Sequence, residues 1–515
     1  MKEFMKTHQV YLTPLTPIHI GCGEEFEPTN YVIDDNVLYH FEPSKLPLNE
    51  YQQDDLYQAV QRNDLLSVQK FYKDNAKQYS GISHYFSKIS DSFADEWQNL
   101  GKVAQREKNG NKVINNFVIE RQSYSSLLNQ PYIPASSVKG ALVTAYLDYC
   151  HQQKGNPKYV NKRDDKDLKK EYVGDFAKSR YRHLSFGDFM PTYKEVGTKI
   201  YYAVNHQRKL SDKKREGNPY QRRESILGGQ YRSFKAEISI KNEKFNFIKE
   251  LDILQKYSLD LFEEELNVLF ERNLISVDTK KALSNIVTIK NTYLVRLGKN
   301  GADSKIYRGQ DVAKINIPQL RKSLNRPLTW WLAGDNKTQS TDLLPFGWAL
   351  LEIDPNSDNN DLKEWCNKNK VNSVNFDEIY QNQKQVQEQI KLIEQEQQQK
   401  LVQEQQALKE EQERQASLSE NQRKIEQTLK AWDDYEVKRY TDNSQVFVEA
   451  QELVKTAISE NWDQNDKALL RAIFDYSDEK SVFNRKVEGL DLSKSAGKLK
   501  GKAKEFKQLL NQLQE

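Results

Sequence analysis

The sequence predicts an α+β fold that is followed by a long polar helix and a small helical bundle. Up to about residue 355, segments rich in β-branched and aromatic residues alternate with stretches in which apolar residues recur at helical spacing. Between 376 and 430 Gln, Glu and Lys dominate, and from 431 to 515 apolar residues again recur at helical spacing. A chain of 515 residues is expected to form on the order of three folded units.

Composition narrows the class of protein further. Hydrophobic residues make up 37% of the chain, which is sufficient for packed cores and argues against an intrinsically disordered protein. The three cysteines, Cys22, Cys150 and Cys366, are too far apart in sequence for a Cys-x-x-Cys metal site or a disulfide framework. We find neither a signal-peptide core nor an apolar run of membrane-spanning length, and therefore expect a soluble protein of the cytoplasm.

The N-terminal segment 10–23 is expected to form one strand, because β-branched and aromatic residues alternate along it. This strand closes on two glycines, Gly21 and Gly23. Pro14 and Pro17 would place the strand at a sheet edge or force a bulge, since proline cannot donate to a ladder.

Residues 31–41 predict a hairpin, because Asp34-Asp35-Asn36 separates two short apolar runs. The alternative for Asp34 and Asp35 is a metal-binding or acidic pair. Helical insertions are expected at about 47–108 and 245–290. Further strands are expected at 113–121, 184–190, 199–205, 230–240, 293–297 and 343–353.

Residues 131–146 predict an extended segment followed by a helix. Ser136 and Ser137 are candidate N-cap residues, which places Lys139 and Gly140 in the first helical turn. Unpaired backbone N–H groups and the positive end of the helix dipole lie there. Because a lysine is unfavourable at this end of a helix, its presence indicates that an anion binds nearby. We predict a phosphate-binding helix start; an ordinary capped helix with an exposed lysine is the alternative.

A second candidate anion-binding segment follows the strand expected at 293–297. Gly298, Lys299, Gly301 and Lys305 place two glycines and two lysines in one loop, which lets a ligand backbone approach closely. The loop is not a Walker P-loop, because Gly-Lys-Ser/Thr is absent at the required spacing.

The segment 208–223 is rich in Lys and Arg and ends in Arg222 and Arg223. Tyr220 lies within it and His206 lies just before it. Basic residues with aromatic neighbours suit contact with an RNA backbone together with base stacking. A solvated surface loop is the alternative.

The polar segment 376–430 is expected to form a solvated helix or linker, since Gln and Glu interrupt the heptad pattern of a coiled coil. Residues 431–515 predict a helical bundle whose last helix, at 498–513, is basic and amphipathic. This C-terminal extension is a candidate arm for docking onto partner proteins, and a solubilising extension is the alternative.

Four short motifs occur in a fixed order along the chain. They are Leu15-Thr-Pro-Ile-His-Ile-Gly-Cys-Gly23, Tyr132-Ile-Pro-Ala-Ser-Ser-Val-Lys-Gly140, Leu297-Gly-Lys-Asn-Gly-Ala-Asp-Ser-Lys305 and Leu344-Pro-Phe-Gly-Trp348. Together they resemble the RAMP superfamily of CRISPR-associated proteins, and most closely the subunit-five family of type III-A Csm effector complexes. Ala135 stands where that family usually has glycine. The resemblance spans about residues 9–355, and residues from about 376 lie outside it.

The resemblance implies two ferredoxin-like, RRM-like domains, at 1–150 and 151–355, whose glycine-rich loops face guide crRNA. It also implies a non-catalytic subunit that caps the backbone filament near the 3′ end of the crRNA and supports crRNA maturation in antiviral defence. Expected partners are crRNA, neighbouring Csm backbone and small helical subunits, and maturation nucleases, without a cofactor, metal, membrane or small-molecule substrate. The predicted RNA-binding residues are Gly21, Gly23, Ser136, Ser137, Lys139, Gly140, Arg222, Arg223, Gly298, Lys299, Gly301 and Lys305.

An enzymatic alternative is a metal-independent RAMP endoribonuclease that processes CRISPR repeat RNA. His19 is the candidate general acid or base for such a reaction. The favoured interpretation of His19 is a strand-end histidine that is hydrogen-bonded to the backbone. His183 and His206 could contact phosphate, but neither has an evident carboxylate or nucleophile partner in the sequence.

Overall fold

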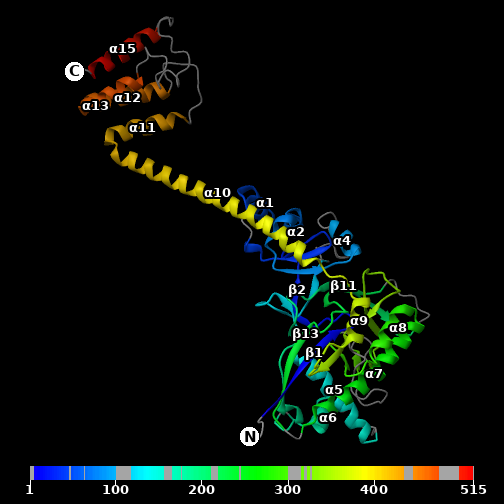
Figure 1. The fold of residues 1–515 in the computed structure, drawn as a ribbon. Coiled ribbons are helices and arrows are strands. Elements are labelled where there is room, and N and C mark those ends of the chain that lie inside the picture. Colours follow the sequence, from blue (N-terminus) through cyan, green and yellow to red (C-terminus); the bar gives the residue numbers. More distant parts are fainter. Residues whose placement is uncertain are drawn as a thin grey trace. The chain divides into compact units, whose positions relative to one another are not determined.

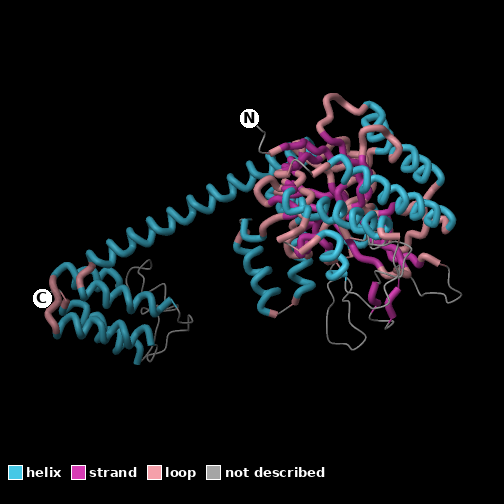
Figure 2. The backbone as a smooth tube through the Cα atoms, turned by 90° about the horizontal axis from the view of Figure 1, so that it is seen from below, coloured by secondary structure: helices cyan, strands magenta, loops and turns pink. Residues whose placement is uncertain are grey.

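The computed structural model divides the chain into two compact units, Met1–Ile393 (unit 1) and Glu394–Glu515 (unit 2). Unit 1 contains strands and helices, whereas the described part of unit 2 is helical (Figures 1 and 2). The structure describes residues 5–45, 48–62, 64–99, 117–155, 165–175, 177–209, 218–242, 245–299, 315–317, 322–324, 327–433, 445–474 and 498–513. Across these residues, none of the helices is long and apolar enough to cross a membrane.

One sheet of unit 1, sheet A, has the first strand of the chain at its centre. Its strands are, in order, β10 (Met190–Pro191), β13 (Phe234–Ile240), β1 (Lys6–Pro14), β19 (Trp348–Ile353) and β14 (Tyr293–Arg296), and β9 (Leu184–Phe186) also pairs with β13. β1 is antiparallel to both neighbours, so that Val10 lies opposite Ala236 in β13 and Ile353 in β19. The order of strands in this sheet therefore differs greatly from their order in the sequence.

The expected single strand over residues 10–23 is wrong in two respects. β1 ends at Pro14, and Gly21 begins a separate strand in another sheet. β1 is also not an edge strand. Because Pro14 is its last residue and Pro17 lies beyond it, neither proline removes a donor from the middle of the ladder.

The helices next to sheet A contribute apolar side chains to the largest buried cluster of unit 1. They are α5 (Ala135–Gln153), α6 (Asp165–Val173), η2 (Arg180–His183), α7 (Phe247–Glu271), α8 (Val277–Ile286) and α9 (Asn360–Asn369). α5 packs against α7, and both contribute apolar side chains to the cluster that contains β1, β13 and β19. Val138 and Leu142 of α5, with Leu251 and Leu254 of α7, are at most 1% exposed. The helices predicted at 131–146 and 245–290 are therefore confirmed.

A second sheet, sheet B, lies beside sheet A in unit 1 (Figure 1). Its strands are, in order, β2 (Gly21–Phe26), β6 (Ile119–Gln122), β12 (Tyr220–Ile226), β11 (Thr198–Gln207), β5 (Tyr85–Lys88), β4 (Val37–His40) and β3 (Tyr31–Asp34), with β17 (Thr329–Gly334) paired to β11 and to β18 (Leu344–Pro345). The predicted hairpin is confirmed as β3 and β4. Asp35 and Asn36 have φ values of 47° and 59°, as a tight hairpin turn requires. Two small hairpins are β7 (Tyr124–Ser125) with β8 (Gln130–Pro131), and β15 (Ile315–Ile317) with β16 (Lys322–Leu324).

The predicted boundary between two domains at residue 150 falls inside α5. Both sheets combine strands from the two sides of this position. β1 pairs with β13 and β19 in sheet A, and β6 pairs with β12 in sheet B. Sheets A and B are consequently interleaved along the chain and do not follow one another.

Where the structure describes it, the insertion predicted at about 47–108 contains helices and one strand. Its helices are α1 (Glu50–Gln61), α2 (Leu65–Asp74), α3 (Ala76–Ile82) and α4 (Asp91–Gln98), and η1 (Pro43–Lys45) precedes it. The prediction is wrong for β5, which lies between α3 and α4 and pairs with β4. Tyr85 and Phe86 in β5 face buried aromatic neighbours on opposite sides of sheet B, which favours strand at this position.

α10 (Phe376–Ser417) begins in unit 1, where its first turns cover a small apolar cluster. Ile379 is 5% exposed and packs with Tyr39 and Phe86 of sheet B. Gln383 Nε2 donates to the carbonyl oxygens of Ser80 and Ser83, at 2.8 and 2.7 Å. The first part of the polar extension is therefore an integral part of unit 1.

Unit 2 begins within α10 and continues as a helical bundle. Its other helices are α11 (Glu420–Asp433), α12 (Gln445–Ser459), α13 (Gln464–Phe474) and α15 (Lys498–Gln512). The helix expected over 376–430 is thus two helices, because α10 ends at Ser417. Trp432, Phe447, Phe474 and Phe506 meet in the core of this unit and are at most 2% exposed.

A buried carboxylate joins two helices of unit 2. Asp466 in α13 is fully buried and accepts hydrogen bonds from Ser419 Oγ, Asn421 Nδ2 and Gln422 Nε2 at 2.9–3.1 Å. These donors lie at the N-terminus of α11, where the helix dipole favours negative charge. Asp466 therefore fixes the start of α11 against α13.

Removing residues 376–393 should destabilise unit 1, whereas removing only 394–515 should not. The shorter chain, 1–375, loses the side chains that cover the cluster around Ile379, and we expect its free energy of unfolding to fall by about 4 kcal/mol relative to chain 1–393. Urea unfolding of the two truncated chains measures the difference. Equal stability of the two would contradict the assignment of these residues to unit 1.

Asp466→Ala should lower the free energy of unfolding of unit 2 by about 2–3 kcal/mol, because three donors lose a charged acceptor. Hydrogen–deuterium exchange of α11 and α13 in the full chain reports this loss. Glu452→Ala is the matched control. Its side chain is exposed on α12, so its effect should stay within about 0.5 kcal/mol.

Candidate functional site

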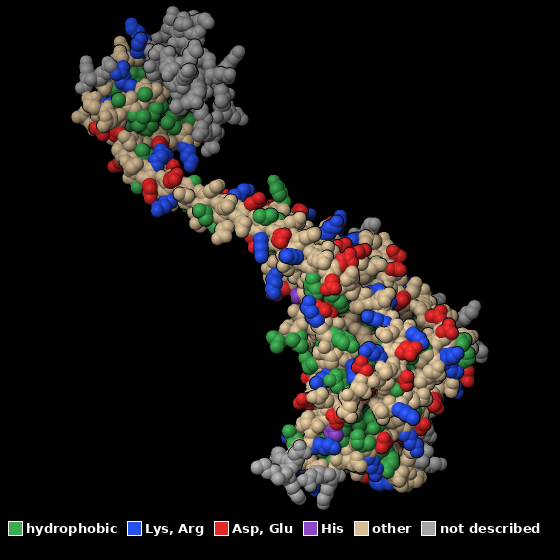
Figure 3. All heavy atoms as spheres, viewed as in Figure 1, with side chains coloured by type: hydrophobic (Ala, Val, Ile, Leu, Met, Phe, Trp, Pro, Cys, Tyr) green, Lys and Arg blue, Asp and Glu red, His purple; other side chains and the backbone are tan. Residues whose placement is uncertain are grey.

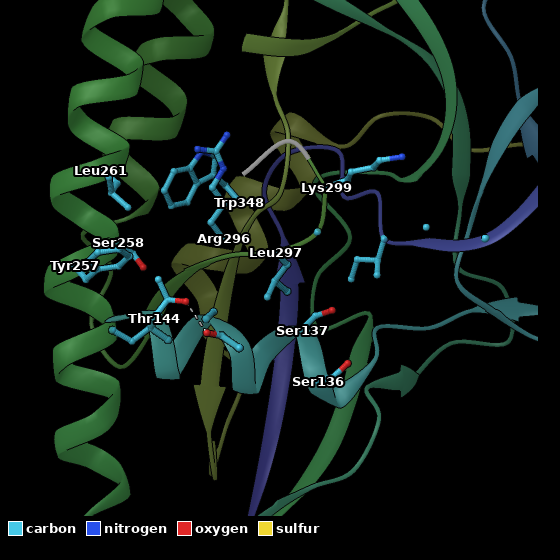
Figure 4. Close-up of a pocket in the computed structure, with 17 residues that line it drawn as sticks. Ser136, Ser137, Thr144, Tyr257, Ser258, Leu261, Arg296, Leu297, Lys299 and Trp348 are labelled. Carbon is cyan, nitrogen blue, oxygen red and sulfur yellow. Dashed lines mark hydrogen bonds between the residues drawn. The ribbon is translucent and has the colours of Figure 1, made fainter. Parts of the chain in front are cut away.

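A cleft with a volume of about 560 Å³ lies between α5, α7 and the ends of β14 and β19 (Figure 4). It is lined by Ile20, Gly21, Gly23, Ser136, Ser137, Gly140, Ala141, Thr144, Leu254, Tyr257, Ser258, Leu261, Arg296, Leu297, Gly298, Lys299 and Trp348. All four sequence motifs contribute to this lining. The predicted residues that it brings together are Gly21, Gly23, Ser136, Ser137, Gly140, Gly298 and Lys299.

Main-chain hydrogen bonds hold three of the motifs together. The N–H of Lys299 donates to the carbonyl of His19 at 2.9 Å. The N–H of Leu297 donates to the carbonyl of Gly347, whose own N–H donates to the carbonyl of Pro17, both at 2.8 Å. The floor of the cleft is therefore built from backbone, with the motifs in direct contact.

Two glycines in these segments are required by the geometry. Gly298 has a φ of 82° and Gly347 a φ of 93°, in the left-handed region that other residues rarely adopt. A Cβ at Gly298 would overlap the carbonyl oxygen of His19, and one at Gly347 would overlap that of Leu297. These glycines permit the close crossing of the three segments.

The start of α5 differs from the prediction. Ser136 and Ser137 do not cap the helix, because Pro134 takes the N-cap position and no side chain caps it. The fixed backbone of Pro134 is already extended at ψ 134°, so both serines fall in the first turn. The N–H of Ala135 donates to Asp188 Oδ1 at 2.7 Å. Ser136 and Ser137 point into the cleft from the N-terminal turn (Figure 4).

Lys139 does not line the cleft. Its Nζ donates to the carbonyl of Leu184 in β9 at 2.9 Å, and burial lowers its pKa. The prediction that its ammonium faces a bound anion beside the helix start is not met by this geometry. The lysine of the cleft is Lys299, from the glycine loop after β14.

The structure also corrects the prediction for Arg222 and Arg223, which end the basic segment 208–223. Arg222 and Arg223 lie within β12 and are only 5% and 3% exposed. Arg222 pairs with Glu96 at 2.5 Å, and Arg223 pairs with Glu120 at 2.7 Å. Both side chains are buried in a packed sheet and act as internal counter-ions. They do not lie in the exposed loop that the sequence predicted.

Other predicted residues lie elsewhere or outside the described part of the chain. Gly301, Lys305 and the residues 210–217 lie outside it. His206 is 5% exposed, with Nε2 3.1 Å from the carbonyl of Gln339, and burial lowers its pKa. It is therefore not available for the phosphate contact considered from the sequence.

Glu120 in β6 is the centre of a charge cluster beside the cleft. Lys299 Nζ lies 2.9 Å from its Oε1, Arg223 Nε lies 2.7 Å from its Oε2, and His19 Nε2 lies 3.4 Å from its Oε2. His19, Lys299 and Arg223 hold the pKa of Glu120 well below its usual range, although partial burial opposes this shift. Sequence reasoning missed Glu120, because an acidic residue in an ordinary strand carries no local signal of its distant partners.

His19 is completely buried. Its Nδ1 lies 2.6 Å from the carbonyl oxygen of Glu224, which confirms the prediction of a histidine bonded to the backbone. A general acid or base must reach a proton on its substrate. With no exposed surface in the described structure, His19 does not meet this condition.

The inner wall of the cleft carries a buried ion pair that sequence reasoning also missed. Arg296 Nη2 lies 2.9 Å from Glu265 Oε1, and Trp348 Nε1 donates to Glu265 Oε2 at 2.8 Å. The guanidinium of Arg296 lies 5.0 Å from the centre of the Trp348 ring. Glu265 thus fixes both side chains, and the only sequence signal was the tryptophan that ends the fourth motif.

The charge distribution outside the cleft is mixed. On the face of unit 1 that Figure 3 shows, basic and acidic side chains are interspersed without a continuous patch of one sign. Among the described residues, no group of three or more His, Cys, Asp or Glu side chains could hold a metal ion. The cleft is therefore the feature of unit 1 with the best-defined binding geometry.

Comparison with known proteins yields one family and a few relatives. The family model described as the RAMP superfamily matches residues 11–476. The CRISPR system Cms protein Csm5 of Methanocaldococcus jannaschii is 23% identical over 320 residues, which cover 58% of this chain and 69% of that protein. The match to 476 corrects the expectation that the whole extension from 376 lies outside the resemblance.

Two solved structures are also similar, each with 16% identity over 67% of this chain and 100% of the other. One is the crystal structure of T. onnurineus Csm5, with a TM-score of 0.40. The other is a chain in the cryo-EM structure of a Csm–crRNA–target RNA ternary complex of a type III-A CRISPR-Cas system, with a TM-score of 0.39.

Glu120→Gln should lower the free energy of unfolding by about 2 kcal/mol at pH 7, because charge-assisted hydrogen bonds from Lys299 and Arg223 are lost. Since folding depresses the pKa of Glu120 from its ordinary value of 4.5, its contribution is complete above that pH and is lost as the pH falls below it. The difference between wild type and variant should therefore shrink between pH 5 and pH 3. Urea unfolding across this range tests the cluster, and a pH-independent difference would contradict it.

Proposed function

The chain belongs to the RAMP superfamily, and we propose that it is a non-catalytic, crRNA-binding subunit of a type III-A Csm effector complex. The similarity to a curated Csm5 supports this proposal at the level of the whole protein. The buried state of His19 supports a binding role over an endoribonuclease.

The observation that carries the proposal is the convergence of four motifs on one cleft. Gly21, Gly23, Gly140 and Gly298 line it and present backbone without a side chain. The N-terminal turn of α5 adds the positive end of a helix dipole, and Lys299 adds a cation. Exposed backbone, a helix N-terminus and a lysine together suit an RNA phosphate.

The order of sheet A supports the ferredoxin-like part of the proposal. Along the chain β1, α5, β9 with β10, β13, α7 and β19 follow a β-α-β-β-α-β sequence, and in space the strands lie in the order β10-β13-β1-β19. We assign sheet A to one such fold and sheet B, whose strands are inserted into it, to the second. The two would then be interleaved rather than separated at residue 150.

The proposal also includes the position of this protein in the Csm complex. We assign this subunit to the end of the backbone filament near the 3′ end of the crRNA, where it would support crRNA maturation. Its proposed partners are the neighbouring Csm backbone and helical subunits and the maturation nucleases. Of the RNA-binding residues predicted from the sequence, we retain Gly21, Gly23, Ser136, Ser137, Gly140, Gly298 and Lys299, which line the cleft. Gly301 and Lys305 remain predictions from the sequence. Lys139, Arg222 and Arg223 would act by supporting the fold.

Lys299→Ala should weaken binding of single-stranded guide RNA and reduce the salt dependence of its affinity. Loss of one phosphate contact lowers the slope of log affinity against log salt by about 0.7. Fluorescence anisotropy at several salt concentrations measures both quantities. Lys281→Ala, an exposed lysine on α8 outside the cleft, is the matched control and should leave the slope unchanged.

Lys139→Ala distinguishes the role of Lys139 from that of Lys299. Because Lys139 Nζ is bound to the Leu184 carbonyl, this substitution should alter stability more than the salt slope. A salt slope reduced by Lys139→Ala and unaffected by Lys299→Ala would contradict our assignment and restore the one made from the sequence.

Chain 1–393 should retain RNA binding but lose contacts with neighbouring helical subunits, if unit 2 is a docking module. Native mass spectrometry of complexes assembled with chain 1–393 or the full chain shows which subunits each retains. Complete assembly with the shorter chain would exclude a docking role for unit 2.

A further inference from the structure

The cleft changes in character from its rim to its interior. Gly21, Gly23, Ser136, Gly298 and Lys299 at the rim are exposed and present backbone groups, a hydroxyl and a cation. The interior lining is apolar and buried, and its members Ile20, Leu254, Leu261, Leu297 and Trp348 are each at most 8% exposed. A ligand that fills the cleft must therefore have a charged part and a flat or compact apolar part.

A hydroxyl group of α7 faces the cleft. Ser258 on α7 is 3% exposed, lines the cleft, and its hydroxyl makes no hydrogen bond to any part of the chain that the structure describes. Figure 4 shows it on the α7 side, across the cleft from the first turn of α5. A ligand with a donor or acceptor at this point gains a hydrogen bond that the described chain does not make.

The interior is also held in a fixed shape. Trp348 is completely buried, and Glu265 fixes its indole N–H while also binding Arg296. A rigid wall of this kind loses little entropy when a ligand enters. At about 560 Å³ the cleft lies in the usual range for sites that hold one small molecule or one unit of a polymer.

We propose that the cleft holds one unstacked nucleobase of the bound RNA, with the adjoining phosphate at the glycine rim and the base in the apolar interior. This inference rests on the proposed RNA-binding function and adds to it the unit that is bound. The base lies against Ala141, Thr144 and Leu261, and Ser258 donates to or accepts from its polar edge. Single-stranded RNA is commonly recognised through bases taken out of the stack in this way.

Two RNA probes of equal length test the proposal with the full chain. One is single-stranded oligouridine, and the other is the same ribose-phosphate chain without bases. If one base enters the cleft, wild-type protein should bind oligouridine about tenfold more tightly than the abasic chain. The comparison does not depend on register, because every position in each probe is the same.

Ala141→Phe is the decisive variant, because Ala141 lines the cleft from α5 and a phenyl ring there occupies the space of the base. Its preference for oligouridine should fall to about twofold or less, while its affinity for the abasic chain stays unchanged. Asn267→Phe, exposed on α7 outside the cleft, is the matched control and should keep the tenfold preference. Ser258→Ala is a second variant, which removes only the hydroxyl oxygen, and should reduce the preference about threefold.

The outcomes separate the inference from the function on which it rests. Failure of wild-type protein to bind either probe would overturn the proposed function itself. Binding of both probes with equal affinity, or a preference that survives Ala141→Phe and Ser258→Ala, would overturn only the base site. A third outcome is that uridine monophosphate binds in the cleft but Ala141→Phe leaves RNA binding unchanged. The cleft would then be a site for a free mononucleotide, and the proposed base site would be overturned.

Discussion

The close approach of three backbone segments at Gly298 and Gly347 is the constraint on which the rest of unit 1 depends. At these points a carbonyl oxygen occupies the space of a side chain, so that the ends of β14 and β19 lie directly against the chain after β1. This contact aligns β1 with β19 and forms the floor of the cleft. α5 and α7 then enclose that floor from one side of sheet A. The fold and the site thus share one set of main-chain contacts.

Several charged side chains beside the cleft are paired with one another inside unit 1. Glu120 is close to three basic groups from separate segments, and Glu265 binds Arg296 under the cleft. Such pairs hold a precise arrangement of side chains. In the proposed function, the cleft would bind phosphate through backbone N–H groups and a helix N-terminus, with Lys299 partly neutralised by its carboxylate neighbour. Affinity from this source depends on geometry more than on net charge.

Local patterns predicted much of this structure, whereas distant pairings could not be predicted. The turn at Asp35 and Asn36 and the helical spacing after Pro134 are short-range signals, and both elements are present. The position of β1 between β13 and β19 depends on partners more than 200 residues away, for which one sequence gives no register. The same applies to the cleft. The glycines were recognisable, but the direction of Lys139 and the existence of Glu120 as a counter-ion depend on which strands become neighbours.

The central position of β1 has a consequence for synthesis of the protein. Residues 6–14 leave the ribosome before both of their neighbouring strands, which end at residues 240 and 353. At translation rates of 5–20 residues per second, the first strand waits roughly 20–70 s for its second partner. During this time its apolar side chains and unpaired backbone groups are available to other nascent chains or to chaperones. Production of this protein in cells should therefore depend on protection of strand β1 until sheet A closes.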